Sequence, residues 1–279
     1  MKKIFRDYDQ AELDAQYEQR AWVPHADAII ARCNAASDAV RSRLGEPLTF
    51  AYGPTASETL DLYRPASSER APLVAFVHGG AWKRQSKHAQ MFPAETFLGA
   101  GAAYAALDFA LLPRVTLPEM VGQVCRALEW LRERCDPSKL VVCGHSSGAH
   151  LAACALTRID VVDEALLVSG IYDLLPVRLS ARNDYVRLDE RLEEEFSPIR
   201  HLGRIRCPVT VGWAEKESAE FARQSREFAA ALGAPTIVGA GLNHFEIIET
   251  LADQRSLLGR AALAMLGERR DSDGRRGAG

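Results

Sequence analysis

Residues 144–148 read Gly-His-Ser-Ser-Gly, a G-x-S-x-G pattern that can carry a nucleophilic serine. Average glycine usage alone would put such a pattern in roughly one chain in ten of this size, so its setting decides its meaning. The apolar run 140–143 comes directly before it, and a helical pattern over 147–157 comes directly after it. A sharp turn between a strand and a helix holds a serine above the sheet, next to a helix N-terminus that stabilises negative charge. The sequence therefore predicts that Ser146 is the nucleophile of an acyl-transfer reaction.

A glycine-rich loop at residues 78–82 (HGGAW) follows the apolar run 73–77. Attack of a serine on a carbonyl creates an oxyanion, and backbone N–H groups must approach that oxygen closely. Two successive glycines permit this approach, and a loop of the HGG type supplies such donors in lipases and esterases. We expect the oxyanion to be held by the N–H groups of Gly80, Ala81 and Ser147.

The general base should be a histidine that follows the serine, because folds with this type of serine turn have the chain order serine, acid, histidine. Three histidines follow Ser146, namely His150, His201 and His244. His150 belongs to the helix that begins at the serine, and His201 lies within a helical stretch over 198–202. His244 comes after the last predicted strand and before a helix, so we predict that it is the base.

The acid that orients this histidine has three candidates. Glu215 and Glu217 follow the penultimate predicted strand, at 209–213, and Asp173 follows the strand before it. Either type of carboxylate can fix the imidazole tautomer and stabilise the imidazolium. Spacing alone favours Glu215 slightly, and the other two candidates stay open at this point.

The elements that must position these groups alternate along the chain. Helical patterns cover 11–20 and 28–44, and alternating segments at 48–52 and 59–63 predict an antiparallel hairpin. Beyond residue 73, short apolar runs typical of strands buried on both faces alternate with helical stretches. The predicted buried strands are 73–77, 102–107, 140–143, 165–168, 209–213 and 236–238, and the main helices are 117–134, 147–157 and 218–232. The predicted fold class is α/β, an α/β-hydrolase fold with a mainly parallel central sheet, helices on both faces and an N-terminal antiparallel hairpin.

The chain of 279 residues is long enough for one large domain, which we expect to span 1–266. Residues 173–196 interrupt the alternation with a polar, charged stretch, which is either a small cap over the active site or a solvated insertion. The tail 267–279 is rich in Gly, Arg and Asp, and we expect it to be disordered.

The composition argues against several function classes. A net charge of -3 implies no basic surface for nucleic acid. No apolar stretch approaches the roughly 18 residues that a membrane span needs, so we expect a cytoplasmic protein with no membrane partner. The six cysteines have no C-x-x-C spacing, which argues against a zinc or thioredoxin-like site and indicates reduced core residues.

Several segments together resemble the arylformamidase (kynurenine formamidase) family of α/β-hydrolases, over most of the chain. They are 78–82 (HGGAW), 144–151 (GHSSGAHL), 168–174 (VSGIYDL), 217–225 (ESAEFARQS) and 243–247 (NHFEI). The fourth segment is similar to the family's D-S-P-E-F-x-R-Q-S stretch, and the fifth to its D-H-F-E-I stretch. Glu217 occupies the position of the family's catalytic aspartate, so the resemblance favours Glu217 as the acid. A second difference is Ser147, which stands where the family usually has alanine.

The resemblance implies hydrolysis of N-formyl-L-kynurenine to L-kynurenine and formate through an acyl-enzyme, with no metal and no organic cofactor. Trp82 and Tyr172 are expected to line a pocket for the aryl group. A carboxylesterase, or a hydrolase of carbamates or other small amides, is the alternative, because the same triad serves esters. A non-catalytic ligand-binding protein on this fold is the alternative of another class. We expect a small-molecule substrate as the partner, and a homodimer stays open.

Overall fold

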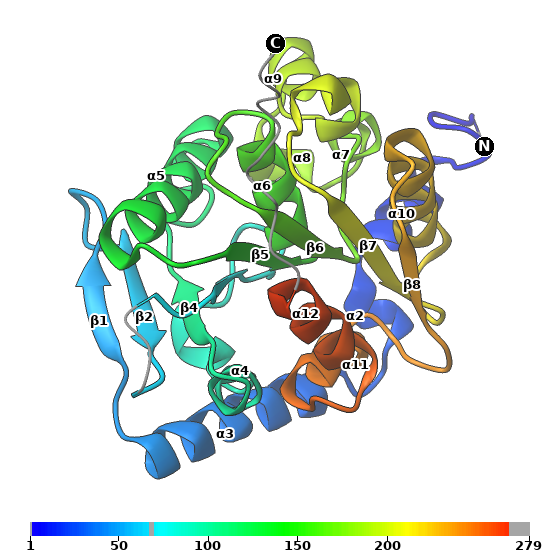
Figure 1. The fold of residues 1–279 in the computed structure, drawn as a ribbon. Coiled ribbons are helices and arrows are strands. Elements are labelled where there is room, and N and C mark those ends of the chain that lie inside the picture. The colour runs from blue at the N-terminus through cyan, green and yellow to red at the C-terminus, as the bar shows by residue number, and fades with distance from the viewer. Residues whose placement is uncertain (1, 67–69, 268–279) are drawn as a thin grey trace, which may run out of the picture.

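The computed structural model describes residues 2–66 and 70–267 and shows a central sheet between two layers of helices (Figure 1). Its strands are β1 Leu48–Ala51, β2 Thr59–Tyr63, β3 Leu73–Val77, β4 Ala103–Leu107, β5 Leu140–His145, β6 Glu164–Val168, β7 Val209–Ala214 and β8 Thr236–Gly239. These described strands form one eight-stranded sheet in the order β1-β2-β4-β3-β5-β6-β7-β8. β1 pairs antiparallel with β2, and β2 with β4, while every other neighbouring pair is parallel. The predicted fold class, including the N-terminal hairpin, is confirmed.

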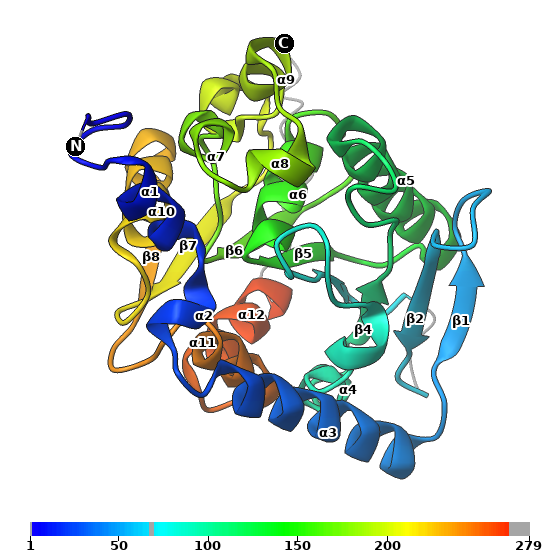
Figure 2. The same ribbon diagram turned by 180° about the vertical axis from the view of Figure 1, so that it is seen from behind.

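Helices cover both faces of this sheet, as the two opposite views show (Figures 1 and 2). The main ones, which pack against the sheet, are α1 Gln10–Tyr17, α3 Ala26–Leu44, α4 Ala94–Gly99, α5 Leu117–Cys135, α6 Ser147–Leu156, α10 Ala219–Leu232 and α12 Leu257–Gly267. The shorter ones are α2 Gln19–Trp22, α7 Leu175–Leu179, α8 Asn183–Val186, α9 Glu190–Glu195, α11 Glu246–Glu249 and the 3₁₀ turns η1 Lys87–Gln90, η2 Pro198–Arg200, η3 Leu202–Arg204 and η4 Thr250–Ala252.

Successive side chains of the buried strands contribute to two separate cores, because they point to opposite faces of the sheet. In β3, Leu73, Ala75 and Val77 pack in the core shared with α1, α5, α6 and α10. Val74 and Phe76 pack in the other core, shared with α3, α4, α11 and α12. Since both faces of the strand are buried, its sequence is a continuous apolar run rather than an alternating one.

Local signals set several helix boundaries. At the start of α5, the hydroxyl of Thr116 accepts from the N–H of Glu119, and the Glu119 carboxylate accepts from the N–H of Thr116 at 2.6 Å. The helix predicted over 11–20 is instead divided into α1 and α2, because the backbone of Glu18 leaves the helical region and its side chain caps the N–H of Arg20. The stretch 198–202 forms 3₁₀ turns rather than an α-helix.

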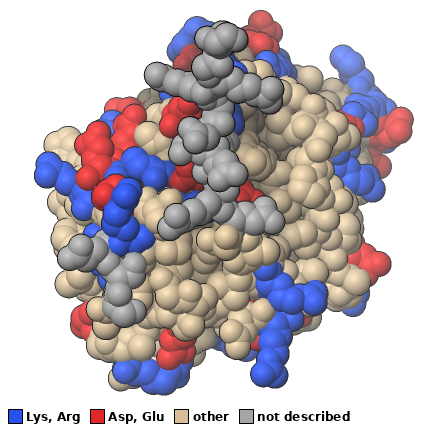
Figure 3. Space-filling view, in the orientation of Figure 1, with Lys and Arg blue, Asp and Glu red and all other residues tan. Residues whose placement is uncertain are grey.

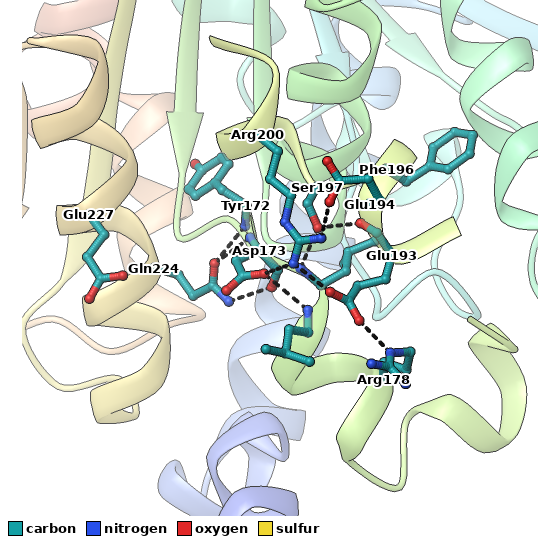
Figure 4. Close-up of polar contacts among 12 residues, drawn as sticks. Tyr172, Asp173, Arg178, Glu193, Glu194, Phe196, Ser197, Arg200, Gln224 and Glu227 are labelled. Carbon is teal, nitrogen blue, oxygen red and sulfur yellow. Dashed lines mark hydrogen bonds and ion pairs between the residues drawn. The ribbon is translucent and has the colours of Figure 1, made fainter. Parts of the chain in front are cut away.

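The segment 173–196 folds into the small helices α7, α8 and α9, and ion pairs connect α7 and α9 with Arg200 (Figure 4). The carboxylate of Glu193 is buried and accepts hydrogen bonds from Arg178 and from Arg200, the latter at 2.5 Å. Asp173 lies 3.3 Å from the same Arg200. The segment also contacts α1, where Asp14 accepts from the N–H of Ala181 at 2.7 Å. The N-terminal helix and this segment therefore meet at the same end of the sheet.

Charged side chains of both signs are mixed along the margin of the face shown in Figure 3, as expected for a chain of small net charge. Among the described helices, none is both long and apolar enough to cross a bilayer. Of the tail that was expected to be disordered, Gly267 closes α12 and residues 268–279 lie outside the described part of the chain.

Candidate active site

Ser146 occupies a strained turn between β5 and α6. Its backbone has φ 56° and ψ −125°, a conformation that a non-glycine residue adopts only when the surrounding structure enforces it. The glycines on either side make the turn possible. A Cβ on Gly148 would lie 2.1 Å from the carbonyl oxygen of Val77, and one on Gly144 would lie 2.7 Å from the Cα of Ala149. The helix can therefore pack tightly against the strands and present the serine hydroxyl at its N-terminus.

The structure brings Ser146, His244 and Glu217 into one hydrogen-bonded line. Nε2 of His244 lies 3.0 Å from Oγ of Ser146, and its Nδ1 lies 2.8 Å from Oε2 of Glu217. All three residues are buried. They come from the turn after β5, the loop after β8 and the loop after β7, which all meet at the carboxyl edge of the parallel strands.

The other two candidate acids are engaged elsewhere. The carboxylate of Glu215 accepts a hydrogen bond from the N–H of Gly241 at 2.6 Å. Asp173 caps the N–H of Leu175 at 3.1 Å and pairs with Arg200 (Figure 4). Neither carboxylate is bonded to His244, so only Glu217 has the geometry of the orienting acid.

Burial controls the protonation of the His244–Glu217 pair. Burial, together with the positive charge of Arg182, lowers the pKa of His244 to about 3, so the imidazole is neutral at pH 7 and can accept a proton. Burial raises the pKa of Glu217 to about 8. Formation of an imidazolium 2.8 Å away opposes that shift, because the new positive charge stabilises the carboxylate. The Glu217 carboxylate therefore stabilises the imidazolium that forms as the serine loses its proton.

The loop after β3 lies against the serine turn. Gly80, Ala81 and Trp82 all have positive φ, at 104°, 53° and 61°. The N–H of Trp82 donates to Oγ of Ser147 at 3.0 Å, which fixes the loop to the start of α6. Within the described part of the chain, the N–H groups of Gly80, Ala81 and Ser147 have no protein acceptor. These three donors are available to an oxyanion formed at Ser146.

His145 supports the base from the opposite side of the turn. Its Nε2 lies 2.9 Å from the carbonyl oxygen of His244, and the two ring centroids are 4.9 Å apart. Burial lowers the pKa of His145 to about 3, so this ring is neutral and its N–H donates to that carbonyl. His145 is thus a positioning residue for the loop that carries His244.

A cavity of about 510 Å³ opens at Ser146 and His244. Its walls come from residues 79–81 and 83–85, from α1, α2 and α3, and from residues 180–182 and 184–185 of the inserted segment. Sequence reasoning missed the contribution of the N-terminal helices, because their amphipathic pattern predicts packing but not which end of the sheet they cover. Arg182, Lys83 and Arg84 are further lining residues that no motif singled out.

The two aromatic residues expected in the aryl pocket do not line this cavity, so that prediction is wrong. Trp82 is 1% exposed, and its ring N–H donates to Nδ1 of His150 at 3.1 Å. Tyr172 is fully buried and stacks on Phe228 with ring centroids 3.9 Å apart. Both rings pack in the core behind the site, because the Trp82 N–H finds an acceptor there and Tyr172 finds an aromatic partner.

Comparison with known proteins places the chain among hydrolases. The BD-FAE family model matches residues 60–165. Kynurenine formamidases of Danio rerio and Salmo salar are 34% and 30% identical to the chain, over 92% and 95% of it and over 96% and 99% of their own lengths. Esterase LipQ of Mycobacterium tuberculosis is 31% identical over 68% of this chain and 54% of its own.

A solved structure of a candidate thioesterase from Silicibacter sp. TM1040 has a TM-score of 0.83 and 27% identity, and the match covers 92% of this chain and 99% of the other. An esterase of Pyrobaculum calidifontis has a TM-score of 0.66 at 20% identity, with 86% of this chain and 91% of the other covered, and so shares the fold. Because the similarity to curated kynurenine formamidases extends over nearly the whole of each chain, this protein belongs to the kynurenine formamidase family of α/β-hydrolases.

Proposed function

We propose that this hydrolase cleaves an aryl formamide, N-formyl-L-kynurenine, to L-kynurenine and formate. The observation that carries the proposal is the 34% identity to a kynurenine formamidase over 92% of the chain. The site supplies every group that such a reaction needs, namely a serine within 3.0 Å of a neutral imidazole and a buried acid on the other side of that imidazole.

The reaction starts when Ser146 attacks the formyl carbon while Nε2 of His244 takes the hydroxyl proton. The carbonyl oxygen becomes an oxyanion held by the N–H groups of Gly80, Ala81 and Ser147. His244 then gives its proton to the aryl nitrogen, so the C–N bond breaks and the arylamine leaves. A formyl ester remains on the serine.

Deacylation repeats the same steps with water. His244 removes a proton from water, the resulting hydroxide attacks the formyl ester, and the tetrahedral intermediate expels the serine oxygen to give formic acid, which loses its proton to solvent as formate. The proton returns from His244 to Oγ of Ser146, which restores the resting site.

The test is steady-state hydrolysis of N-formyl-L-kynurenine, followed by absorbance, beside p-nitrophenyl acetate and with Ser146→Ala as the control. The proposal expects a much higher kcat/KM for formylkynurenine and no turnover by the Ser146→Ala variant. If the enzyme does not hydrolyse formylkynurenine, the substrate assignment is wrong.

An esterase is the second candidate, favoured by the 31% identity to esterase LipQ. It predicts that acetyl or longer acyl esters exceed formylkynurenine in kcat/KM. A non-catalytic role predicts that an active-site phosphonate leaves Ser146 unlabelled, whereas both enzymatic candidates require labelling.

A further inference from the structure

Arg182 lies at the cavity wall with only part of its guanidinium engaged. Its side chain lines the same cavity as Ser146 and His244. Nη2 donates to the backbone carbonyl of Tyr17, which ties the inserted segment to the end of α1. Nη1 is buried and, among the described residues, has no hydrogen-bond partner. A buried donor on a charged group is costly to leave unpaired, so an acceptor is expected at this position.

Aromatic rings hold this guanidinium in place. Its Cζ lies 5.5 Å from the ring centroid of Tyr17 and 5.8 Å from that of Trp82. Both rings are buried, so they cannot move aside without disturbing the core. The direction of the free Nη1 is therefore set before any ligand arrives, which favours binding because less side-chain freedom is lost.

Two further cationic side chains line the cavity with Arg182. Lys83 and Arg84 line the same cavity, and neither forms an ion pair within the described part of the chain. The ammonium of Lys83 instead lies 3.9 Å from the ring centroid of Tyr185. By contrast Arg20, which also lines the cavity, is paired with Asp27. Glu18 offsets part of the charge of Lys83, but within the described residues neither Arg84 nor Arg182 forms an ion pair, so these cations attract an anionic ligand.

The positive charge is also close to the chemistry. Arg182 and His244 line one cavity, and the charge of Arg182 contributes to the lowered pKa of His244. A ligand group on Arg182 would belong to the same molecule that reacts at the serine. Acidic lining residues Glu18 and Asp184 stand in the same wall and could face a cationic group of that molecule.

We propose that Arg182 is the binding residue for a carboxylate of the substrate, placed on the part of the molecule that leaves as the amine. The free Nη1 edge meets a carboxylate oxygen, as arginine does in charge-assisted pairs. This inference rests on the proposed function only in naming the group, which in formylkynurenine is the α-carboxylate of the amino acid.

The experiment uses inhibitors, so it does not depend on which substrate the enzyme prefers. The assay measures the inhibition constants of L-kynurenine and of kynuramine against hydrolysis of p-nitrophenyl acetate at pH 8. Kynuramine is the same molecule as kynurenine without the carboxylate. For the wild-type enzyme, kynurenine should bind more tightly by about 10-fold or more, the usual scale for a hydrogen-bonded charge pair. A wild-type ratio near one would overturn the proposal by itself.

Substitutions of Arg182 test whether this residue is the one that binds the carboxylate. Arg182→Met and Arg182→Gln should bring the ratio of the two inhibition constants close to one, mainly by weakening kynurenine, and Arg182→Lys should keep part of it. Arg187→Met removes the same charge from an exposed residue of the same segment outside the cavity wall, and should keep the full ratio. A ratio that survives in both neutral Arg182 variants would assign the carboxylate to another residue and refute the proposal.

The two proposals can fail separately. If formylkynurenine is not hydrolysed but the carboxylate still strengthens inhibition through Arg182, the formamidase assignment falls and the carboxylate site stands. 2-Formamidoacetophenone lacks the amino-acid group of formylkynurenine. If the enzyme hydrolyses both compounds with the same KM, the formamidase function is supported and the carboxylate site is refuted.

Discussion

Shortening the triad acid by one methylene tests whether Glu217 is held at a fixed distance from the base. In the structure Oε2 of Glu217 lies 2.8 Å from Nδ1 of His244, and both residues are buried. Glu217→Asp keeps the charge and the chemistry of the carboxylate, but the side chain is shorter by one C–C bond. Because the packed backbone around the loop after β7 cannot follow freely, the contact should open.

The size of the effect follows from this distance. One bond of about 1.5 Å opens the contact to about 4.3 Å, which is beyond hydrogen-bond range. At an effective dielectric of about 20, the attraction between the carboxylate and the imidazolium falls from about 6 to about 4 kcal/mol. A loss of about 2 kcal/mol from the transition state lowers kcat by about 30-fold.

The assay is kcat for p-nitrophenyl acetate and for formylkynurenine, measured at pH 8 with the melting temperature as a check on folding. Glu215→Asp is the matched control, since Glu215 is bonded to Gly241 and not to the base, and it should keep kcat within about twofold. Glu217→Gln should lose more activity than Glu217→Asp, because it removes the charge altogether. If Glu217→Asp matches the wild type in a folded protein, the distance argument is wrong.

Three further predictions concern the surroundings of the triad. Ser147→Ala removes the acceptor of the Trp82 N–H and should destabilise the protein by about 1–3 kcal/mol, seen as a melting temperature lower by a few degrees; an unchanged value would show that water replaces the hydroxyl. Burial lowers the pKa of His150 to about 4, below its usual 6.5, so the unfolded chain binds more protons between these values and stability falls as pH drops from 6.5 to 4. In His150→Gln that decline should be shallower by about 1.4 kcal/mol per pH unit, measured by denaturant unfolding at several pH values, and an equal slope would refute the assignment. Arg182→Met removes a cation that disfavours the imidazolium of His244, so the acid limb of kcat/KM should move to higher pH; a shift to lower pH would contradict the electrostatic argument.

The strands could be predicted closely because burial leaves a local trace in the sequence. A strand covered on both faces needs consecutive apolar side chains, and residues 73–77 form β3 with the predicted bounds. The points at which a helix is interrupted are harder to predict from the sequence. Glu18 divides the predicted 11–20 helix, although the residues around it are good helix formers, because its side chain caps the next turn. At His201 the backbone leaves the helical region while the ring bonds to the carbonyl of Glu194 at 2.9 Å.

The nucleophile and the base were singled out by local context, but the acid was not. Glu215, Glu217 and Asp173 all follow strands of the sheet, and spacing slightly favoured Glu215. The three carboxylates differ in the contacts that they make in the folded protein. Glu215 reaches the N–H of Gly241, and Asp173 is held by Arg200, whereas Glu217 turns inward to the imidazole. The resemblance to the family favoured Glu217, and the geometry gives the physical reason.

The same reasoning explains why substrate specificity is harder to infer than the reaction. The serine, its base and the N–H donors stand on loops that leave the sheet, whose geometry is set by the parallel strands. The wall opposite them comes from the N-terminal helices and residues 180–182 and 184–185, which are joined by bonds such as Asp14 to Ala181 and Arg182 to Tyr17. That wall can change in sequence without affecting the triad, so related hydrolases can keep the chemistry and exchange the substrate. Arg182 joins the two parts of this wall, lines the cavity and keeps a buried donor without a partner among the described residues, so it is the residue at which the substrate of this enzyme can be tested apart from its mechanism.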